Sequence, residues 1–352
     1  MNELSLDFYG IAAILRCEDA AVFNELREDF KYFISDYAPA REIPISWELS
    51  LCEPPKSELP LGLASLRLRD YKVYDRGRLR RIVYDDNALA VYDYRARRGR
   101  IYCGDCRRLH ELAYLAVLSR VGEELDLKGL HRIHALGFEH KGEAGLVLLP
   151  SGGGKSTLAL ELLKRTDIGI IADDTPLIGP DLRLHAFPLS WGFLPTADLS
   201  SIPKGMIRRF QRKHYGVKKL VDVDFFRSRI SSGKPLRRLI IGSRHSGRPR
   251  LERASRPQAL RALAVHLIAG HGIAQMSEYM LSLNLTRTFN LLDIAFARAA
   301  LAWRVARRTQ LCRLMLGPDA RANAGFLEDL LRSGIEKDSP AGEPLGTANA
   351  RR

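Results

Sequence analysis

In the N-terminal part of the chain, apolar residues recur at every second position in several segments, which is the period of a half-buried strand. One segment instead places Phe23, Leu26, Phe30 and Phe33 on a single helical face. Together the patterns predict strands at residues 4–15 and 45–51, a helix at 20–34, a strand meander at 66–102 and a helix at 107–124. We therefore expect an N-terminal α+β accessory domain over residues 1–125.

Beyond residue 125, short apolar runs alternate with helical patterns, which is typical of an α/β domain. The runs predict strands at 130–138, 145–149, 168–172, 177–178, 182–184 and 235–243, and helices at 158–165, 258–270 and 289–308. Residues 139–143 are expected to turn the first strand back into the second. The second domain is thus predicted over residues 126–335 with a helical C-terminal part, and 336–352, poor in apolar residues, as a disordered tail.

A glycine loop reading SGGGKST lies between the apolar run at 145–149 and the helical pattern at 158–165. Strand, glycine loop, Lys-Ser and helix, in this order, are the layout of a phosphate-binding loop. Glycines let backbone N–H groups approach phosphate oxygens, and the following helix offers its positive end to the same anion. The predicted nucleotide-binding residues are Ser151, Gly152, Gly153, Gly154, Lys155, Ser156 and Thr157.

This loop departs from the usual pattern at its entry. A glycine normally stands five residues before the last loop glycine, and here that position is Leu149, so Pro150 must shape the entry. The alternative interpretation of the segment is a glycine-rich turn before a helix, with no ligand.

Two adjacent carboxylates, Asp173 and Asp174, follow the predicted strand 168–172 and lie 18 and 19 residues beyond Lys155. Open α/β sheets place their chemistry at the carboxyl ends of strands. One carboxylate can hold Mg²⁺ while the other accepts a proton from an attacking hydroxyl. The alternative is an ordinary Asp-Asp turn at a strand end.

Taken in order, His134, the glycine loop at 151–157, the ALEL segment at 159–162, and Asp173-Asp174 resemble the HPr kinase/phosphorylase family. The similarity covers residues 130–195. It implies a compact phosphate-loop fold shared with phosphoenolpyruvate carboxykinase, and the transfer of phosphate from ATP to a serine hydroxyl. Within the resemblance, the chain is similar to the divergent members that include the lasso-peptide precursor kinases.

The resemblance also implies roles for single residues. Lys155 and Ser156 would bind nucleotide and Mg²⁺, Asp173 would be the base, Asp174 a metal-side acid, and His134 an active-site neighbour. The spacing to the acids is one residue longer than in the HPr enzymes, and the signature associated with dephosphorylation has no counterpart. HPr is therefore not the expected acceptor, and phosphorylase activity is not expected.

The sequence thus predicts an ATP- and Mg²⁺-dependent kinase that phosphorylates a serine on a peptide or small protein, such as a ribosomal precursor peptide. Two other classes stay open: a nucleotide-binding scaffold or assembly ATPase, and a nucleic-acid-associated ATPase. A kinase leaves phosphate on an acceptor, a scaffold ATPase releases it without one, and a nucleic-acid protein binds with steep salt dependence.

Composition sets the remaining expectations. Of the 352 residues, 46% are hydrophobic and 27% charged, as in ordinary globular proteins, and no stretch is long and apolar enough for a membrane span. The start resembles no secretory signal, so we expect a cytoplasmic protein, and we expect a homo-oligomer. Cys103 and Cys106 form the one close cysteine pair, interpreted as two reduced thiols and not as a metal site.

The net charge of +14 is concentrated in one region. Residues 204–256 hold 17 Lys or Arg against three acids, with aromatic residues between them. This density would suit a nucleic acid, an acidic peptide or a solvated surface. Beside a kinase-type site, we interpret it as a phosphate- and substrate-facing segment, and a nucleic-acid partner is not expected.

Overall fold

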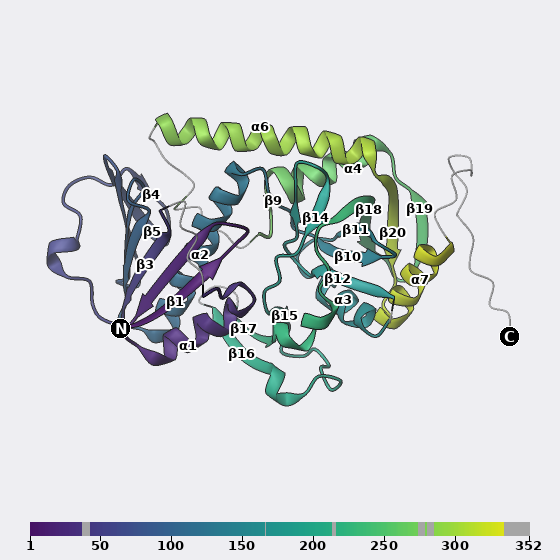
Figure 1. Cartoon of the computed structure of the whole chain (residues 1–352), viewed down its shortest axis with the longest axis horizontal. Helices are drawn as coiled ribbons and strands as arrows, with labels where there is room; N and C mark the ends of the chain where they lie inside the picture. Colours follow the sequence, from purple (N-terminus) through teal and green to yellow (C-terminus); the bar gives the residue numbers. More distant parts are fainter. Residues whose placement is uncertain (37–42, 166, 213–215, 274–278, 280–284, 334–352) are drawn as a thin grey trace. The chain divides into compact units, whose positions relative to one another are not determined.

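The computed structural model describes residues 1–36, 43–165, 167–212, 216–273, 279 and 285–333, which form a mixed α/β structure with several sheets (Figure 1). The α/β class is therefore confirmed. The chain divides into two compact units, of which the first contains residues 1–128, 208–219 and 274–292, and the second the remainder. Among the described residues, none of the helices has the length and apolar content to cross a membrane.

The first unit is built on an eight-stranded sheet with the order β1-β2-β3-β8-β7-β6-β5-β4. Its strands are β1 (Asn2–Asp7), β2 (Ala12–Cys17), β3 (Ile45–Ser50), β4 (Leu66–Arg67), β5 (Tyr71–Arg76), β6 (Leu79–Tyr84), β7 (Leu89–Asp93) and β8 (Arg98–Tyr102). The strand predicted at 45–51 and the meander predicted at 66–102 are confirmed. The short helical turn η2 (Lys56–Glu58) precedes the meander.

Two predictions in this unit are wrong in detail. Residues 4–15 form the hairpin of β1 and β2, not one strand, because Tyr9 and Gly10 take left-handed φ values of 58° and 80° and reverse the chain. The helix predicted at 20–34 stops earlier, as α1 (Ala20–Asp29) followed by η1 (Lys31–Phe33). Phe30 leaves the helical conformation, and its ring stacks on Tyr114 of α2 (Cys106–Leu127).

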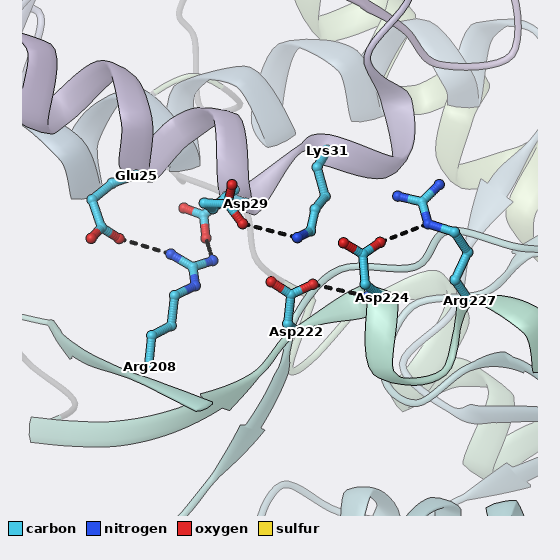
Figure 2. A network of polar contacts seen from close by, with 8 residues as sticks. Glu25, Asp29, Lys31, Arg208, Asp222, Asp224 and Arg227 are labelled. Atoms are coloured by element: carbon cyan, nitrogen blue, oxygen red, sulfur yellow. Dashed lines mark hydrogen bonds and ion pairs between the residues drawn. The ribbon is translucent and has the colours of Figure 1, made fainter. Parts of the chain in front are cut away.

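A distant segment of the chain joins this unit through Arg208, at the start of the hairpin of β16 (Ile207–Arg212) and β17 (Gly216–Val221). The Arg208 guanidinium donates to Glu25, at 2.8 Å, and to Asp29 (Figure 2). The other Asp29 oxygen lies 2.7 Å from Nε2 of His110. Burial alone would raise the pKa of Asp29, but the His110 hydrogen bond and the Arg208 charge outweigh it and lower the pKa.

The second unit contains the sheet order β12-β10-β11-β18-β14-β13-β9, with β20 paired to β18 and β19 to β20. These strands are β9 (His131–Arg132), β10 (Leu136–His140), β11 (Glu143–Leu148), β12 (Ile168–Ala172), β13 (Leu177–Ile178), β14 (Arg183–His185), β18 (Lys234–Arg244), β19 (Arg250–Arg253) and β20 (Gln310–Leu316). The strands predicted at 168–172, 177–178 and 235–243 are confirmed. β19 and β20 were not predicted.

Four strands of this sheet run in one direction. β11, β18 and β20 pair in parallel, and β12 matches them because both β12 and β11 are antiparallel to β10. Their carboxyl ends therefore lie at one edge of the sheet, and the start of β10 lies at the same edge. In open α/β sheets this is the edge where ligands bind.

Helices cover the sheet of the second unit. The apolar residues Ala144, Leu146 and Leu148 alternate along β11 and pack in one core with helical residues such as Leu263 and Val305. The helical elements are α3 (Lys155–Leu163), α4 (Arg256–Leu263), the π-helical turn η6 (Ala264–Ile268), α6 (Leu285–Arg308) and α7 (Ala320–Ser333). The helix predicted at 258–270 is thus divided between α4 and η6. Short elements complete the unit: β15 (Trp191–Phe193), η3 (Lys204–Met206), η4 (Val223–Phe225) and η5 (Arg227–Arg229).

The basic stretch at 204–256 is divided among several elements and between the two units. Its residues are distributed over β16, β17, β18 and β19, and residues 208–219 belong to the first unit whereas the rest belong to the second. The predicted tail at 336–352 lies outside the described residues.

We predict that Arg208→Ala lowers the free energy of unfolding by about 1–3 kcal/mol, because it removes a charged partner from the buried Asp29 carboxylate. Arg209→Ala, at an exposed neighbour on the same strand, is the control and should change little. Urea unfolding measures both. Because the pKa of Asp29 is lowered in the folded chain, its carboxylate stabilises the fold at pH values above the ordinary pKa of 3.8. The loss of stability caused by Arg208→Ala should therefore be full at neutral pH and shrink below pH 3.8. Equal effects of the two substitutions would contradict the prediction.

Candidate active site

The glycine loop at 151–157 leaves the carboxyl end of β11 and leads directly into α3. Gly152 and Gly154 have φ values of 72° and 95°, where side chains with a Cβ are strained, and the Gly153 amide donates to the Pro150 carbonyl at 2.9 Å. A Cβ at Gly154 would also collide with the Arg244 guanidinium. The loop thus needs glycine at 152 and 154 for conformation and at 153 for space, where a Cβ would lie 2.8 Å from the Pro150 carbonyl oxygen.

The first turn of α3 presents backbone N–H groups at the loop. Gly154 is the N-cap and provides no side-chain cap, so the amides of Lys155, Ser156 and Thr157 precede the first helical hydrogen bond, which Leu158 donates to Gly154. Amides in this position, at the positive end of a helix, attract anions. This geometry suits phosphate oxygens.

Lys155 turns its side chain into the site and is only 6% exposed. Its Nζ lies 3.2 Å from the carbonyl oxygen of Leu149, 2.8 Å from Nε2 of His134 and 3.5 Å from Oδ1 of Asp174. A buried ammonium needs such partners, because burial of an unpaired charge is costly. The Lys155 ammonium is therefore held between the entry of the glycine loop, at Leu149, and the Asp174 carboxylate.

Ser156 and Asp173 form the second contact of the site. The Ser156 hydroxyl donates to Oδ2 of Asp173 at 2.9 Å. Asp173 is buried, and burial, followed by the adjacent charge of Asp174, raises its pKa to about 8. A hydroxyl and a carboxylate oxygen side by side are hard ligands of the kind Mg²⁺ prefers.

Asp174 contacts His134, whereas Asp173 contacts Ser156. Nε2 of His134 lies 3.0 Å from Oδ1 of Asp174. The side chain of Asp174 is 48% exposed. Its residual burial would raise the pKa, but the His134 hydrogen bond and the charges of His134 and Lys155 prevail and lower it. Asp174 is therefore the ionised and accessible member of the pair, whereas Asp173 is the buried one.

One nitrogen of His134 faces two groups. Nε2 can accept a hydrogen bond from the Lys155 ammonium or donate one to the Asp174 carboxylate, but it carries at most one proton. Since Lys155 and Asp174 also approach each other, these three side chains share their protons and charge. The cluster can exchange a proton with an incoming group through Asp174, its exposed member.

The backbone places His134 at this point. His134 was predicted within a strand, but it lies between β9 and β10, a correction that follows from its hydrogen bonds. Its amide donates to the carbonyl of His266, and the next amide, of Ala135, donates to the carbonyl of Asp174, both at 3.0 Å. Gly272, with φ of 94°, packs against the imidazole where any Cβ would collide with it.

Sequence patterns missed two residues of the site. His266 lies on the π-helical turn η6, and its Nδ1 is 3.3 Å from Nδ1 of His134. Burial, and then the neighbouring His134 and Lys155, lower the pKa of His266 to about 4, so it is neutral. Arg244 ends β18, and its Nε donates to the carbonyl of Gly153 at 3.0 Å. The sequence offered only a weak signal for Arg244, a basic residue at a predicted strand end, and no signal for His266.

The structure brings the predicted residues together. Lys155, Ser156, Asp173, Asp174 and His134 lie at one edge of the second unit's sheet. The predicted residues Ser151, Gly152 and Thr157 are exposed on the loop, and Thr157 with Gly154 and Arg244 lines a cavity of about 70 Å³ that extends to Asn323 of α7. None of the predicted site residues is remote from the others.

In the part of the chain that the structure describes, no three His, Cys, Asp or Glu side chains form a cluster that could enclose a metal ion. Mg²⁺ needs no such cage, since it commonly keeps several waters and uses one or two protein ligands together with substrate phosphates. Ser156 and Asp173 fit that kind of site. The Cys103 and Cys106 thiols are free, and burial raises the pKa of both.

Comparison of the chain with protein-family models finds no matching family, and a search of curated proteins finds no match.

Asp173→Asn should change the pH dependence of stability. The raised pKa of Asp173 means that the folded chain keeps a proton which the unfolded chain releases above the ordinary value of 3.8. Stability linked to this proton is fully present below the ordinary pKa and is lost as the pH rises toward about 8. We expect the wild-type free energy of unfolding to fall relative to that of Asp173→Asn across this window, measured by urea unfolding.

Asp181→Asn is the control, because the Asp181 carboxylate is exposed. Its profile should run parallel to that of the wild type. A parallel profile for Asp173→Asn as well would show that the pKa of Asp173 is not raised in the folded chain.

Proposed function

We propose that this protein is a P-loop kinase that transfers the γ-phosphoryl group of ATP to a serine hydroxyl of a peptide or small protein, with Mg²⁺. The observation that carries the proposal is the placement of two pairs at one sheet edge, Ser156 with Asp173 and Lys155 with Asp174. A phosphate-binding loop beside one buried and one accessible carboxylate is what phosphoryl transfer needs. The resemblance to the HPr kinase family supports the same function.

Phosphate would be held by the loop. The amides at the start of α3 and the Lys155 ammonium offer donors and positive charge at one point, and positioned charge of this kind stabilises a transferring phosphoryl group. Lys155 reaches that position by exchanging its contact with the Leu149 carbonyl for phosphate oxygens. Arg244, beside Gly153 and Gly154, adds a second cation at the loop.

The contacts favour an exchange of the two aspartate roles that the resemblance implies. Asp173 touches Ser156 and is shielded from solvent, which suits a carboxylate on the metal side. Asp174 is half exposed and ionised, so an acceptor hydroxyl can reach it and lose its proton to it. Mg²⁺, when bound by Ser156 and Asp173, would neutralise phosphate charge.

His134 would orient the base. Its backbone amide is held by the His266 carbonyl, and its ring by the packing of Gly272 and by the His266 imidazole, so Nε2 stays directed at Asp174 and Lys155. A fixed imidazole can take up a share of the proton that Asp174 receives. His134 is thus a positioning residue that acts through Asp174.

A second candidate function is a scaffold ATPase, which would use the same loop and metal side. It has no need for an accessible base held by a histidine and a lysine, and the Asp174 cluster therefore favours the kinase. The serine acceptor and its peptide character rest on the resemblance alone.

Lys155→Ala should weaken nucleotide binding by about 10- to 100-fold, because a charge-assisted contact contributes about 1.5–3 kcal/mol. Isothermal titration with Mg²⁺-ATP measures this. Lys164→Ala is the matched control, since Lys164 caps the other end of α3 and is exposed. Unchanged affinity in Lys155→Ala would remove the glycine loop from nucleotide binding.

The two aspartates should respond differently to replacement by asparagine. We expect Asp174→Asn to keep Mg²⁺-nucleotide affinity within a few-fold and to lower phosphoryl transfer to a pool of serine-containing peptides by about 10² or more, the size of a general-base contribution. Asp173→Asn should instead raise the Mg²⁺ concentration needed for half-maximal activity.

The reverse pattern would restore the roles implied by the resemblance and leave the kinase intact. Full transfer activity in both variants would exclude the double Asp from the chemistry. ATP consumption that no peptide in the pool accelerates would favour the scaffold ATPase.

A further inference from the structure

A cavity of about 70 Å³ lies beside the glycine loop, within the second unit. Part of its lining comes from the loop and the first turn of α3, up to Leu158, and part from the end of β20 and the start of α7. Arg244, at the end of β18, completes the lining. Helices α3 and α7 pack against each other, so neighbouring elements of one unit build the cavity (Figure 1).

The wall of the cavity at the start of α7 is apolar and held in place. It consists of Leu316, Pro318 and Ala320. The side-chain oxygen of the buried Asn323 accepts a hydrogen bond from the Gly317 amide at 2.8 Å, and its nitrogen donates to the Gly317 carbonyl at 3.0 Å. Because both ends of one amide bind the same residue, the turn that carries the wall is fixed on α7.

Arg244 brings a flat cation to the same cavity. Its Nε donates to the Gly153 carbonyl at 3.0 Å, and its guanidinium occupies the space that a Cβ on Gly154 would need. Since Nε is used in this way, Arg244 offers a ligand its two Nη groups and the face of the guanidinium. Guanidinium groups stack on flat aromatic rings. A flat cation beside an apolar wall therefore suits the planar ring of a nucleobase.

The first turn of α3 leads from the proposed reaction centre to this cavity. The Lys155 ammonium lies 3.5 Å from Asp174, and the Ser156 hydroxyl contacts Asp173. Thr157, the next residue, is exposed and lines the cavity. A phosphate chain whose terminal group lies at Lys155 and Asp174 would therefore follow the amides of this turn and reach Thr157 with its other end.

The cavity is open to solvent, because Thr157, Arg244 and Pro318 are exposed. One water needs roughly 10–15 Å³ of such space, so about 70 Å³ admits part of a flat ring and leaves the remainder at the surface. This matches a group that is joined to phosphates in the loop and held on one side only.

We propose that this cavity receives the nucleoside of the phosphate donor, with the base against the Arg244 guanidinium and the start of α7. The inference rests on the proposed phosphoryl transfer and specifies its donor as a nucleoside triphosphate. Inorganic tripolyphosphate has the same chain of phosphates but no group for the cavity, so the loop alone would bind it.

Isothermal titration of the full chain with Mg²⁺-ATP and with Mg²⁺-tripolyphosphate tests the inference. We expect the wild type to bind ATP at least about 10-fold more tightly, because only ATP brings a ring to the cavity. The ratio of the two affinities isolates the nucleoside, since contributions of the phosphates enter both.

Ala320→Phe should remove the preference for ATP. Ala320 is the first residue of α7 and lines the cavity, so the larger side chain would occupy the space of the base. We expect its ATP affinity to fall to about that of tripolyphosphate, with tripolyphosphate affinity unchanged. Ala322→Phe is the matched control, because it adds the same ring to the same turn at an exposed position outside the cavity lining, and it should keep the wild-type ratio. Circular dichroism verifies that both variants fold.

Arg244→Lys tests the stacking surface. The substitution keeps a positive charge near the phosphates and removes the planar guanidinium, so the ratio of ATP to tripolyphosphate affinity should fall by about 3-fold or more.

The outcomes separate this inference from the proposed function. Equal wild-type affinities for the two ligands, both weakened by Lys155→Ala, would overturn the nucleoside site and leave phosphate binding by the loop intact. A preference for ATP that survives Ala320→Phe would place the nucleoside elsewhere. Binding of neither ligand would overturn the proposed function and the inference with it.

Discussion

The site depends on four strands of one sheet running in the same direction. β11, β12, β18 and β20 run the same way, although β11 and β12 are separated by β10. Their common edge collects the glycine loop, the double Asp and Arg244 from sequence positions up to 93 residues apart (151 to 244). A reversal of any one strand would move its residue to the opposite edge. The hydrogen bond from the Ala135 amide to the Asp174 carbonyl then fixes His134 against this edge.

Within that edge, different surroundings give two neighbouring carboxylates opposite pKa shifts. Asp173 lies beneath the loop helix with a hydroxyl as its nearest partner, and its pKa is raised to about 8 by burial and by the Asp174 charge. Asp174, half exposed and beside Lys155 and His134, has a lowered pKa. A pair of acids separated in this way can divide metal binding and proton transfer between them, and this division is the physical basis of the proposed kinase.

The sequence predicted what local pattern determines. The strand at 168–172, the glycine loop and its helix each follow from a few adjacent residues. Contacts between residues far apart in the chain could not be predicted from local sequence patterns. His266 contacts His134, 132 residues away, and Arg208 contacts Asp29, 179 residues away. The break of 4–15 into a hairpin was missed because Tyr9, a residue that favours strands, takes a left-handed conformation there.

The location of the metal and the phosphates tests the proposed site most directly. A crystal of the protein grown with Mn²⁺ and a non-hydrolysable ATP analogue reports the metal by its anomalous scattering. We predict one manganese peak between the Ser156 hydroxyl and the Asp173 carboxylate, with the β- and γ-phosphates on the amides that open α3 and Lys155 turned toward them. Manganese and phosphates bound elsewhere in the chain, or manganese held by Asp174 without Asp173, would contradict it.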